Sequence, residues 1–236
     1  MSDAGKQGLS DLSDDMLGFG ARELVTARDL VLRPDVVLAA WMEQGPEGGG
    51  RYARPLRLYL AMNAVLMLML FLRGGAGFLL DSLSPETLSD LAGRSGKSME
   101  AFVADADNWM TFVMVPLLAT FYALAAAPLL RWWDAENLGW RRGFRSAFAW
   151  LCAWTILCLP LGWWAYGQGA VQTLVAVAFF ALSLVSFLCM GRGRWYRSTA
   201  VGVMKGFALT LAVLAAGLLG GNLVVGVGLL AALYTP

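Results

Sequence analysis

Histidine is missing from the 236-residue chain, and charged residues of both signs make up only 15% of it. The absence of histidine removes the commonest general base, the commonest metal ligand and the usual axial ligand of membrane haem. The shortage of charge is equally informative, because about a quarter of the residues in a soluble domain are charged. Since 58% of the residues are hydrophobic, the composition indicates a membrane protein.

Cysteine is also scarce, and its three positions, Cys152, Cys158 and Cys189, lie inside apolar runs. This placement argues against a zinc ribbon and against the disulfide framework of a secreted domain. A cleavable signal peptide is not expected, because the first 50 residues contain no continuous apolar core. The first apolar segment is therefore expected to direct the chain to the membrane. The net charge of +1 argues neither for nor against nucleic acid, and no nucleic-acid partner is expected.

Five apolar segments have about the length of a helix that crosses a bilayer core, which needs about 20 residues. The first is short, but Arg57 and Arg73 at its ends can reach the interfaces and extend it. The predicted spans are 57–73, 109–130, 146–164, 170–190 and 207–233. The sequence therefore predicts an all-α integral membrane protein with five transmembrane helices.

The basic residues are distributed unevenly around these spans. Fifteen of the 18 lysines and arginines lie before the first span, between the second and third, or between the fourth and fifth, and three lie on the other side. Because cytoplasmic loops carry the excess of basic residues, the N-terminus is expected in the cytoplasm and the C-terminus outside. The expected location is the bacterial cytoplasmic (inner) membrane.

The segments outside the spans have their own patterns. Residues 1–16 are expected to be disordered, and residues 17–50 are expected to form two cytoplasmic amphipathic helices, separated at Pro34, and a glycine-rich hinge. The outer loop 74–108 is expected to contain a short helix from Pro85 to about Leu91, ending near Gly93, and a second helix from about Ser98 into the second span. This loop carries six acidic residues and fits either a solvated cap or a docking surface for a basic partner.

Two groups of residues are candidates for contact with lipid or with other helices. Arginines at the cytoplasmic ends of the spans, together with one tyrosine, are predicted membrane anchors that meet anionic headgroups; these are Arg51, Arg54, Arg57, Tyr59, Arg141, Arg142 and Arg145. Gly217 and Gly221 have the GxxxG spacing that lets helices approach closely. We expect them to pack within the bundle first, and in a homo-oligomer second.

Catalytic chemistry finds little support in the sequence. Apart from Arg57 and Arg73 at the two ends of the first, no predicted span contains a lysine, arginine, aspartate or glutamate, which disfavours proton-coupled transport. Asp134 and Glu136 lie among arginines, but two carboxylates without a third acid or histidine make a poor metal site. No catalytic, cofactor-binding or metal-binding residue is predicted, and the protein is not expected to be an enzyme. Polar residues within the spans, such as Asn63 and Asn222, are expected to hydrogen-bond between helices.

The segment RDLVLRPDVVLAAWMEQGPEGGGRYARPLRLYLAMN resembles a family of uncharacterised bacterial membrane proteins. In that family a glycine-rich turn precedes the motif R-Y-x-x-P-x-R-x-Y, matched here by Arg51, Tyr52, Pro55, Arg57 and Tyr59. The resemblance covers roughly residues 28–72. Many members carry a zinc ribbon ahead of the motif, whereas this chain has no cysteine there and resembles a form without it. The expected topology is also similar to that of the Yip1 superfamily, whose members act in membrane trafficking, and neither resemblance implies catalytic residues.

Three functions are compatible with these patterns. The first is a non-enzymatic scaffold or accessory subunit of a membrane protein complex, with membrane lipids and a membrane protein or a second copy of the chain as partners. The alternative is an oligomeric channel or facilitator built through the glycine-rich face of the fifth span. The second alternative is a lipid-modifying enzyme that uses Arg141, Arg142 and Arg145 for headgroup phosphate.

Overall fold

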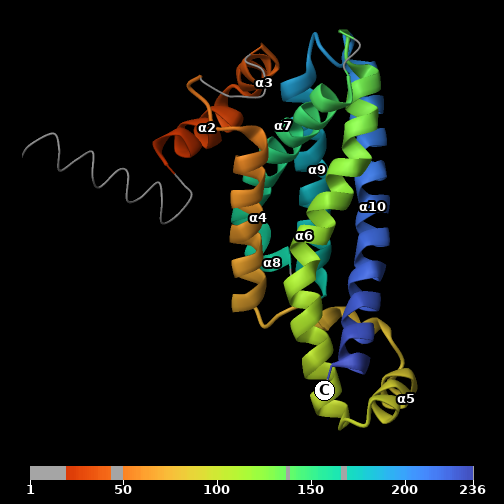
Figure 1. Ribbon diagram of the computed structural model, residues 1–236. Coiled ribbons are helices and arrows are strands. Elements are labelled where there is room, and N and C mark those ends of the chain that lie inside the picture. The colour runs from red at the N-terminus through yellow and green to blue at the C-terminus, as the bar shows by residue number, and fades with distance from the viewer. Residues whose placement is uncertain (1–19, 44–49, 137–138, 166–168, 236) are drawn as a thin grey trace, which may run out of the picture.

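A computed structural model describes residues 20–43, 50–136, 139–165 and 169–235. Within these ranges the chain is helical and contains no β-strand (Figure 1). The described residues include five helices long and apolar enough to cross a membrane, as predicted, so this is a multi-pass membrane protein. Their bounds are α4 Pro55–Leu72, α6 Met99–Trp133, α7 Trp140–Cys158 continuing through η2 Leu159–Leu161 and α8 Gly162–Ala165, α9 Ala170–Gly191, and α10 Thr199–Tyr234.

Helices α6 and α10 are longer than the spans predicted at 109–130 and 207–233. They have 35 and 36 residues, which at 1.5 Å per residue makes each roughly 50 Å long. A serine caps the start of each helix: Ser98 Oγ accepts a hydrogen bond from the Ala101 amide, and Ser198 Oγ from the Val201 amide. Because these caps precede the apolar runs, the helices begin outside the segments that hydropathy identifies.

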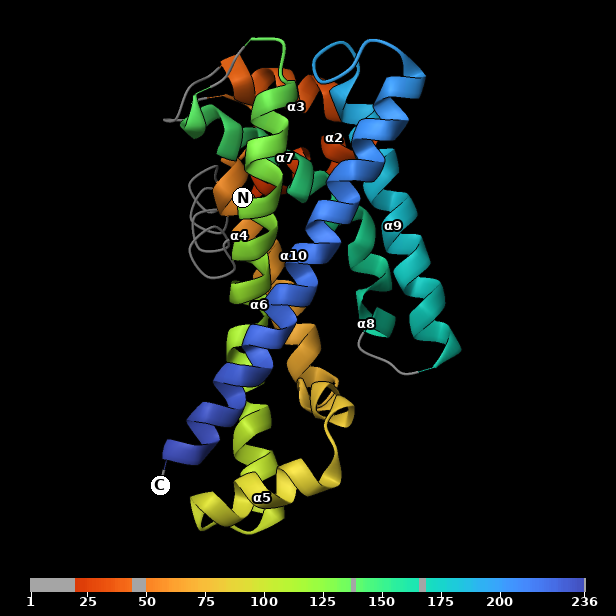
Figure 2. The same cartoon turned by 90° about the vertical axis from the view of Figure 1, so that its right-hand side faces the viewer.

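The two ends of the bundle are built differently. Helices α2 (Ala21–Leu32) and α3 (Pro34–Glu43) lie at one end, and the C-terminal end of α10 lies at the other (Figures 1 and 2). Helices α6 and α10 run the full length and continue past α8 and the beginning of α9 (Figure 2). There they pack against α5 (Pro85–Ser95), and α6 also packs against η1 (Gly77–Ser82). We call this part, made of η1, α5 and the adjoining ends of α6 and α10, the projection.

Close contact between α6 and α10 depends on glycine. A Cβ atom on Gly220 would lie 2.8 Å from Leu118 Cδ2, and one on Gly228 would lie 2.9 Å from the carbonyl oxygen of Ala106. Both separations are too short for a real carbon, and because the one at Gly228 is to a backbone atom, the two helices approach there as closely as only glycine allows. This contact supports the projection, because it continues where α4 and α9 no longer flank the pair.

Helix α2 is oriented with its polar face toward the protein. Thr26 and Asp29 are fully buried, whereas Leu24 and Val31 are 63% and 50% exposed. The sequence separates the same two faces, but the structure turns the polar one inward. Helix α3, which begins at Pro34 directly after α2, packs its apolar residues against α7 and α9.

The outer segment forms the helix predicted from Pro85, but α5 continues past Leu91 to Ser95. Ser84 Oγ accepts a hydrogen bond from the Thr87 amide at its start. Gly96 ends the helix with a φ of +72°, a left-handed conformation that glycine adopts without strain. The chain can therefore turn directly into α6.

Candidate functional site

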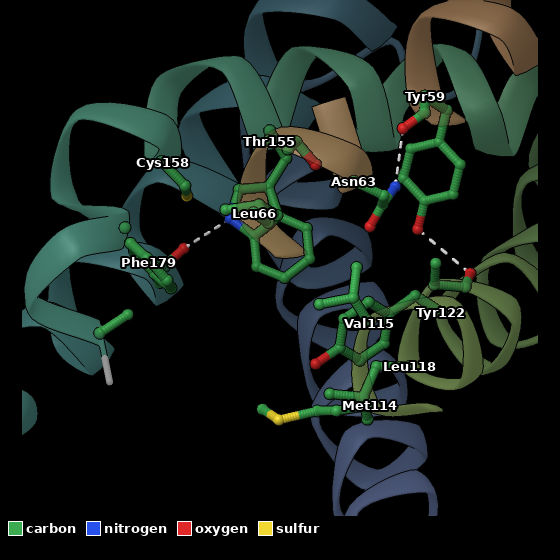
Figure 3. A pocket seen from close by; sticks show the side chains of 14 residues that line it. Tyr59, Asn63, Leu66, Met114, Val115, Leu118, Tyr122, Thr155, Cys158 and Phe179 are labelled. Carbon is green, nitrogen blue, oxygen red and sulfur yellow. Dashed lines mark hydrogen bonds between the residues drawn. The ribbon is translucent and has the colours of Figure 1, made fainter. Parts of the chain in front are cut away.

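A cavity of about 190 Å³ lies between α4, α6 and α7 and is also lined by residues of α8 and α9. Figure 3 shows its lining, which includes Asn63 of α4, Tyr122 of α6 and Thr155 of α7. The other walls are mainly apolar and come from residues such as Leu66 and Met114. The cavity therefore combines an apolar interior with a few polar groups, which is the usual composition of a small-molecule site.

Tyr59 fixes the contact between α4 and α6 at this cavity. Its ring is buried, and its hydroxyl donates a hydrogen bond of 3.1 Å to the carbonyl oxygen of Ala119. One turn further along α4, Asn63 Nδ2 donates to the Tyr59 carbonyl oxygen at 2.7 Å (Figure 3). The amide nitrogen of Asn63 is thereby occupied, while its Oδ1 accepts no hydrogen bond from any described residue.

Two hydroxyls at the cavity also retain hydrogen-bonding capacity. In the described part of the chain, neither Tyr122 nor Thr155 makes a side-chain hydrogen bond. Trp154 lies beside Tyr122 with a ring separation of 6.0 Å, and its indole nitrogen donates to the Phe179 carbonyl oxygen at 3.0 Å. The tryptophan is thus held in place, and three polar groups from three helices remain available to a guest.

A second, more open cavity of about 430 Å³ lies on the other side of the same contact. It shares Tyr59, Asn63, Val115 and Ala119 with the first. Helix α4 therefore stands between two apolar spaces and meets α6 along a narrow strip.

The predicted anchors Arg51 and Arg57 have protein partners. Arg51 Nη2 lies 3.1 Å from Asp29 Oδ2, and Arg57 Nε lies 3.2 Å from Glu23 Oε1. Both side chains remain about half exposed, so contact with headgroups stays a prediction for them, and Arg54 is likewise exposed. Tyr59 lies inside the bundle rather than at its surface.

Asp29 is the centre of the junction between α2 and the segment before α4. Its side chain is fully buried and contacts Arg28 at 2.8 Å and Arg33 at 3.4 Å, and the hydroxyl of Tyr52 donates to it at 3.1 Å. The hydrogen bond from Arg28 lowers the pKa of Asp29 below 3.8, although burial opposes it. Burial and the bond to Asp29 raise the pKa of Tyr52 above 10.0.

The other predicted anchors lie at the start of α7. Arg141 and Arg142 are exposed, and Arg142 approaches Glu136 at 3.9 Å. Arg145 instead donates to the carbonyl oxygen of Trp41 at 3.2 Å, near the C-terminal end of α3. A cation there satisfies a helix carbonyl and complements the helix dipole, so Arg145 holds α3 on the bundle.

In the sequence, Asp134 is a weak candidate for a metal site. Its carboxylate is fully buried and is paired with Arg194 Nε at 2.5 Å. It also accepts a hydrogen bond from the Glu136 amide at 3.0 Å. This ion pair joins the α6–α7 loop to the α9–α10 loop. No group of three potential metal ligands occurs among the residues that the structure describes.

The two glycines of the GxxxG pattern differ in their surroundings. A Cβ on Gly217 would lie 3.1 Å from the Tyr122 hydroxyl, so this glycine gives room to a ring that lines the cavity. Gly221 has open space where a Cβ would stand. The α10 glycines in closer contact with α6, Gly220 and Gly228, are spaced by eight residues and do not form the GxxxG pattern.

Hydrogen bonds between helices are fewer than the polar residues of the spans predict. Ser183 and Thr210 are 2.6 Å apart and join α9 to α10. In contrast, Asn63 and Asn222 bond to carbonyl groups of their own helices. The sequence gives no signal for the cavity either, because its polar residues come from three separate spans.

Comparisons with protein-family models, with curated proteins and with solved structures found no match to this chain. A functional assignment therefore depends on the residues and geometry described above.

Proposed function

We propose that the protein is a non-enzymatic scaffold or accessory subunit of a membrane protein complex in the bacterial inner membrane. The excess of basic residues before α4 and in the loops at the α2–α3 end supports a cytoplasmic position for that end. The projection then stands outside the cytoplasm. The role is one of binding, and the buried carboxylates at the α2–α3 end, Asp29 and Asp134, are held in structural ion pairs with arginines.

The observation that carries this proposal is the construction of the projection. Lys97 Nζ contacts Asp105 at 2.6 Å and donates to the Ala232 carbonyl oxygen at 3.0 Å, which ties the start of α6 to the end of α10. The amide of Ala76 donates to Thr111 Oγ1 at 2.7 Å and holds the chain before η1 against α6. A surface supported in this way is pre-organised for a partner.

The chemistry of this surface favours a basic partner. Exposed acids on α5 and near it, Asp81, Glu86, Asp90 and Glu100, outnumber the exposed Arg94. Lys97, the other cation of the segment, is bound to Asp105 within the protein. Complementary charge raises the rate and specificity of association more than it raises affinity.

The test is co-purification from native membranes in mild detergent, with chemical cross-linking beforehand. Glu86→Lys combined with Asp90→Lys should release at least one partner that the wild type retains. Asp35→Lys with Glu43→Lys reverses two exposed acids on α3 and serves as the control with equal net charge. A solitary monomer at native expression, or an unchanged set of partners in the Glu86/Asp90 variant, would refute the proposal.

A second candidate, an oligomeric channel or facilitator, is favoured by the outer face of α10. Asn222 is exposed there, and Gly221 beside it leaves open space. Amides and small residues are common at interfaces between transmembrane helices. If this face forms an oligomer that conducts, Gly221→Leu should dissociate it and abolish flux in liposomes, and an intact oligomer would refute this version.

A further inference from the structure

The cavity between α4, α6 and α7 is a second candidate for binding, independent of the projection. We propose that it binds one molecule of a neutral lipid alcohol, meaning an apolar chain with a single hydroxyl group, taken from the surrounding bilayer. The inference goes beyond the scaffold role and uses none of the residues of the projection.

The position of the cavity indicates a lipid rather than a water-soluble ligand. Asn63 lies midway along α4, and Thr155 lies near the middle of the span Trp140–Ala165. At this depth the surrounding medium is hydrocarbon. The cavity adjoins a second, more open space, because Tyr59, Asn63, Val115 and Ala119 line both. Exposed residues of that second space, such as Leu60 and Leu124, face lipid. A lipid chain is therefore the molecule in most direct supply.

The lining excludes a charged headgroup. None of the 14 residues around the cavity is Lys, Arg, Asp or Glu. Moving a phosphate into such surroundings without a cation is costly, because no group compensates for its lost hydration. The guest is therefore neutral along the part that the cavity holds.

The polar groups select a hydroxyl in particular. Asn63 Oδ1 can only accept a hydrogen bond, whereas the hydroxyls of Tyr122 and Thr155 can donate one. No hydrogen bond joins these three groups to one another among the described residues. A lipid hydroxyl donates to Asn63 and accepts from Thr155 or Tyr122, so it satisfies both kinds of group. A ketone, quinone or ether only accepts and leaves Asn63 Oδ1 without a donor.

The remaining walls suit the chain of such a lipid. Leu66, Met114, Leu118 and Phe179 provide apolar surface next to the polar groups. Tyr122 keeps its place because Gly217 has no side chain, with a Cβ there only 3.1 Å from the tyrosine hydroxyl. A methyl group at position 217 would move Tyr122, and with it one wall of the cavity.

The experiment uses the full-length protein in nanodiscs of phosphatidylcholine. The probe is a long-chain fatty alcohol that carries a photoreactive diazirine, and the comparators are its methyl ether and the matching ketone. Peptides of α4, α6 and α7 should be labelled by the alcohol about fivefold more than by either comparator, since one hydrogen bond contributes about 1 kcal/mol. Equal labelling by alcohol and ether would overturn the proposal, and preferential labelling by the ketone would replace it with a carbonyl lipid.

Matched variants locate the effect. Asn63→Leu, and Thr155→Val combined with Tyr122→Phe, should each reduce alcohol labelling about fivefold, to the level of the ether. The controls are Asn222→Leu and Thr173→Val. Asn222 bonds to a carbonyl group of its own helix as Asn63 does, and Asn222 and Thr173 are both exposed away from the cavity. If Asn63→Leu fails to fold, the nearly isosteric double change Thr155→Val with Tyr122→Phe decides, because it removes both hydroxyls that can donate to the guest, and labelling that it leaves unchanged would refute the site.

Discussion

At the α2–α3 end of the molecule, segments far apart in the sequence are joined through carboxylates and arginines. Asp29 holds the segment before α4 through Arg51, and Asp134 holds the α9–α10 loop through Arg194. At the opposite end, α6 and α10 are joined mainly by apolar packing around Gly220 and Gly228. Lys97 adds a hydrogen bond to the Ala232 carbonyl oxygen of α10. Removing one partner of a buried ion pair is strongly destabilising, whereas a close glycine contact is destabilised by any increase in side-chain volume. The two ends should therefore fail under different substitutions.

The largest effect should come from breaking the ion pair of Asp134. Arg194→Met leaves the buried carboxylate without its cation and should cost about 3 kcal/mol, as the removal of one partner of a buried pair does. Thermal unfolding in detergent measures the loss. Arg197→Met, on an exposed arginine of the same loop, should leave the midpoint unchanged. A midpoint that is equally unchanged in Arg194→Met would show that the pair contributes no stability.

An intermediate effect is expected at the opposite end. Gly228→Ala places a methyl group against Met110 and 2.9 Å from the Ala106 carbonyl oxygen, so α6 and α10 must separate. Overpacking of this kind costs about 1–3 kcal/mol, measurable as a lower unfolding midpoint. Gly221→Ala adds the same methyl group into open space and should have little effect. Equal losses in the two variants would place the destabilisation in the helix itself and not in the contact.

The smallest effect on global stability should follow Asp29→Asn, because this change releases only α2. Hydrogen exchange of the α2 amides should accelerate about tenfold or more, as expected for local opening. Asp35→Asn, on an exposed acid of α3, is the control and should leave exchange in α2 as it is in the wild type. Unaltered protection in Asp29→Asn would show that the apolar contacts of α2 and α3 suffice.

The same junction gives a pH dependence with a defined sign. The lowered pKa of Asp29 means that its contribution is present above 3.8 and is lost as the pH falls through the folded-state value. The raised pKa of Tyr52 means that its contribution is present below 10.0 and is lost as the pH rises through its folded-state value. Protection of the α2 amides, measured as the exchange rate relative to the intrinsic rate at each pH, should therefore show a plateau between these limits, and a transition near neutral pH would contradict this account.

The sequence predicts the five spans well because long apolar runs are a local signal. It also predicts a helix from about Ser98 into the second span, and α6 confirms this prediction with its cap at Ser98, although the apolar run alone does not include residues 99–108. The direction in which α2 faces could not be predicted, because the partners of Asp29 include Arg51 and Tyr52, more than 20 residues later in the chain.

The candidate cavity could not be predicted from the sequence either. Asn63, Tyr122 and Thr155 are unremarkable in their own spans and become a group only when three helices meet. The glycine pattern shows a related limit. Gly217 and Gly221 have the familiar spacing, but the contact with α6 is centred on glycines eight residues apart. Spacing identifies a face of a helix, whereas the neighbouring helix decides which residues of that face matter.

The length of α10 has a consequence for the membrane itself. Its 36 residues are almost entirely apolar beyond Lys205, and they exceed what a bilayer core of about 30 Å can cover if the helix stands upright. Hydrophobic mismatch of this kind is relieved by inclination of the helix or by local stretching of the lipid tails. The protein should then distribute preferentially into thicker bilayers, and reconstitution with phosphatidylcholines of increasing acyl length should show this preference.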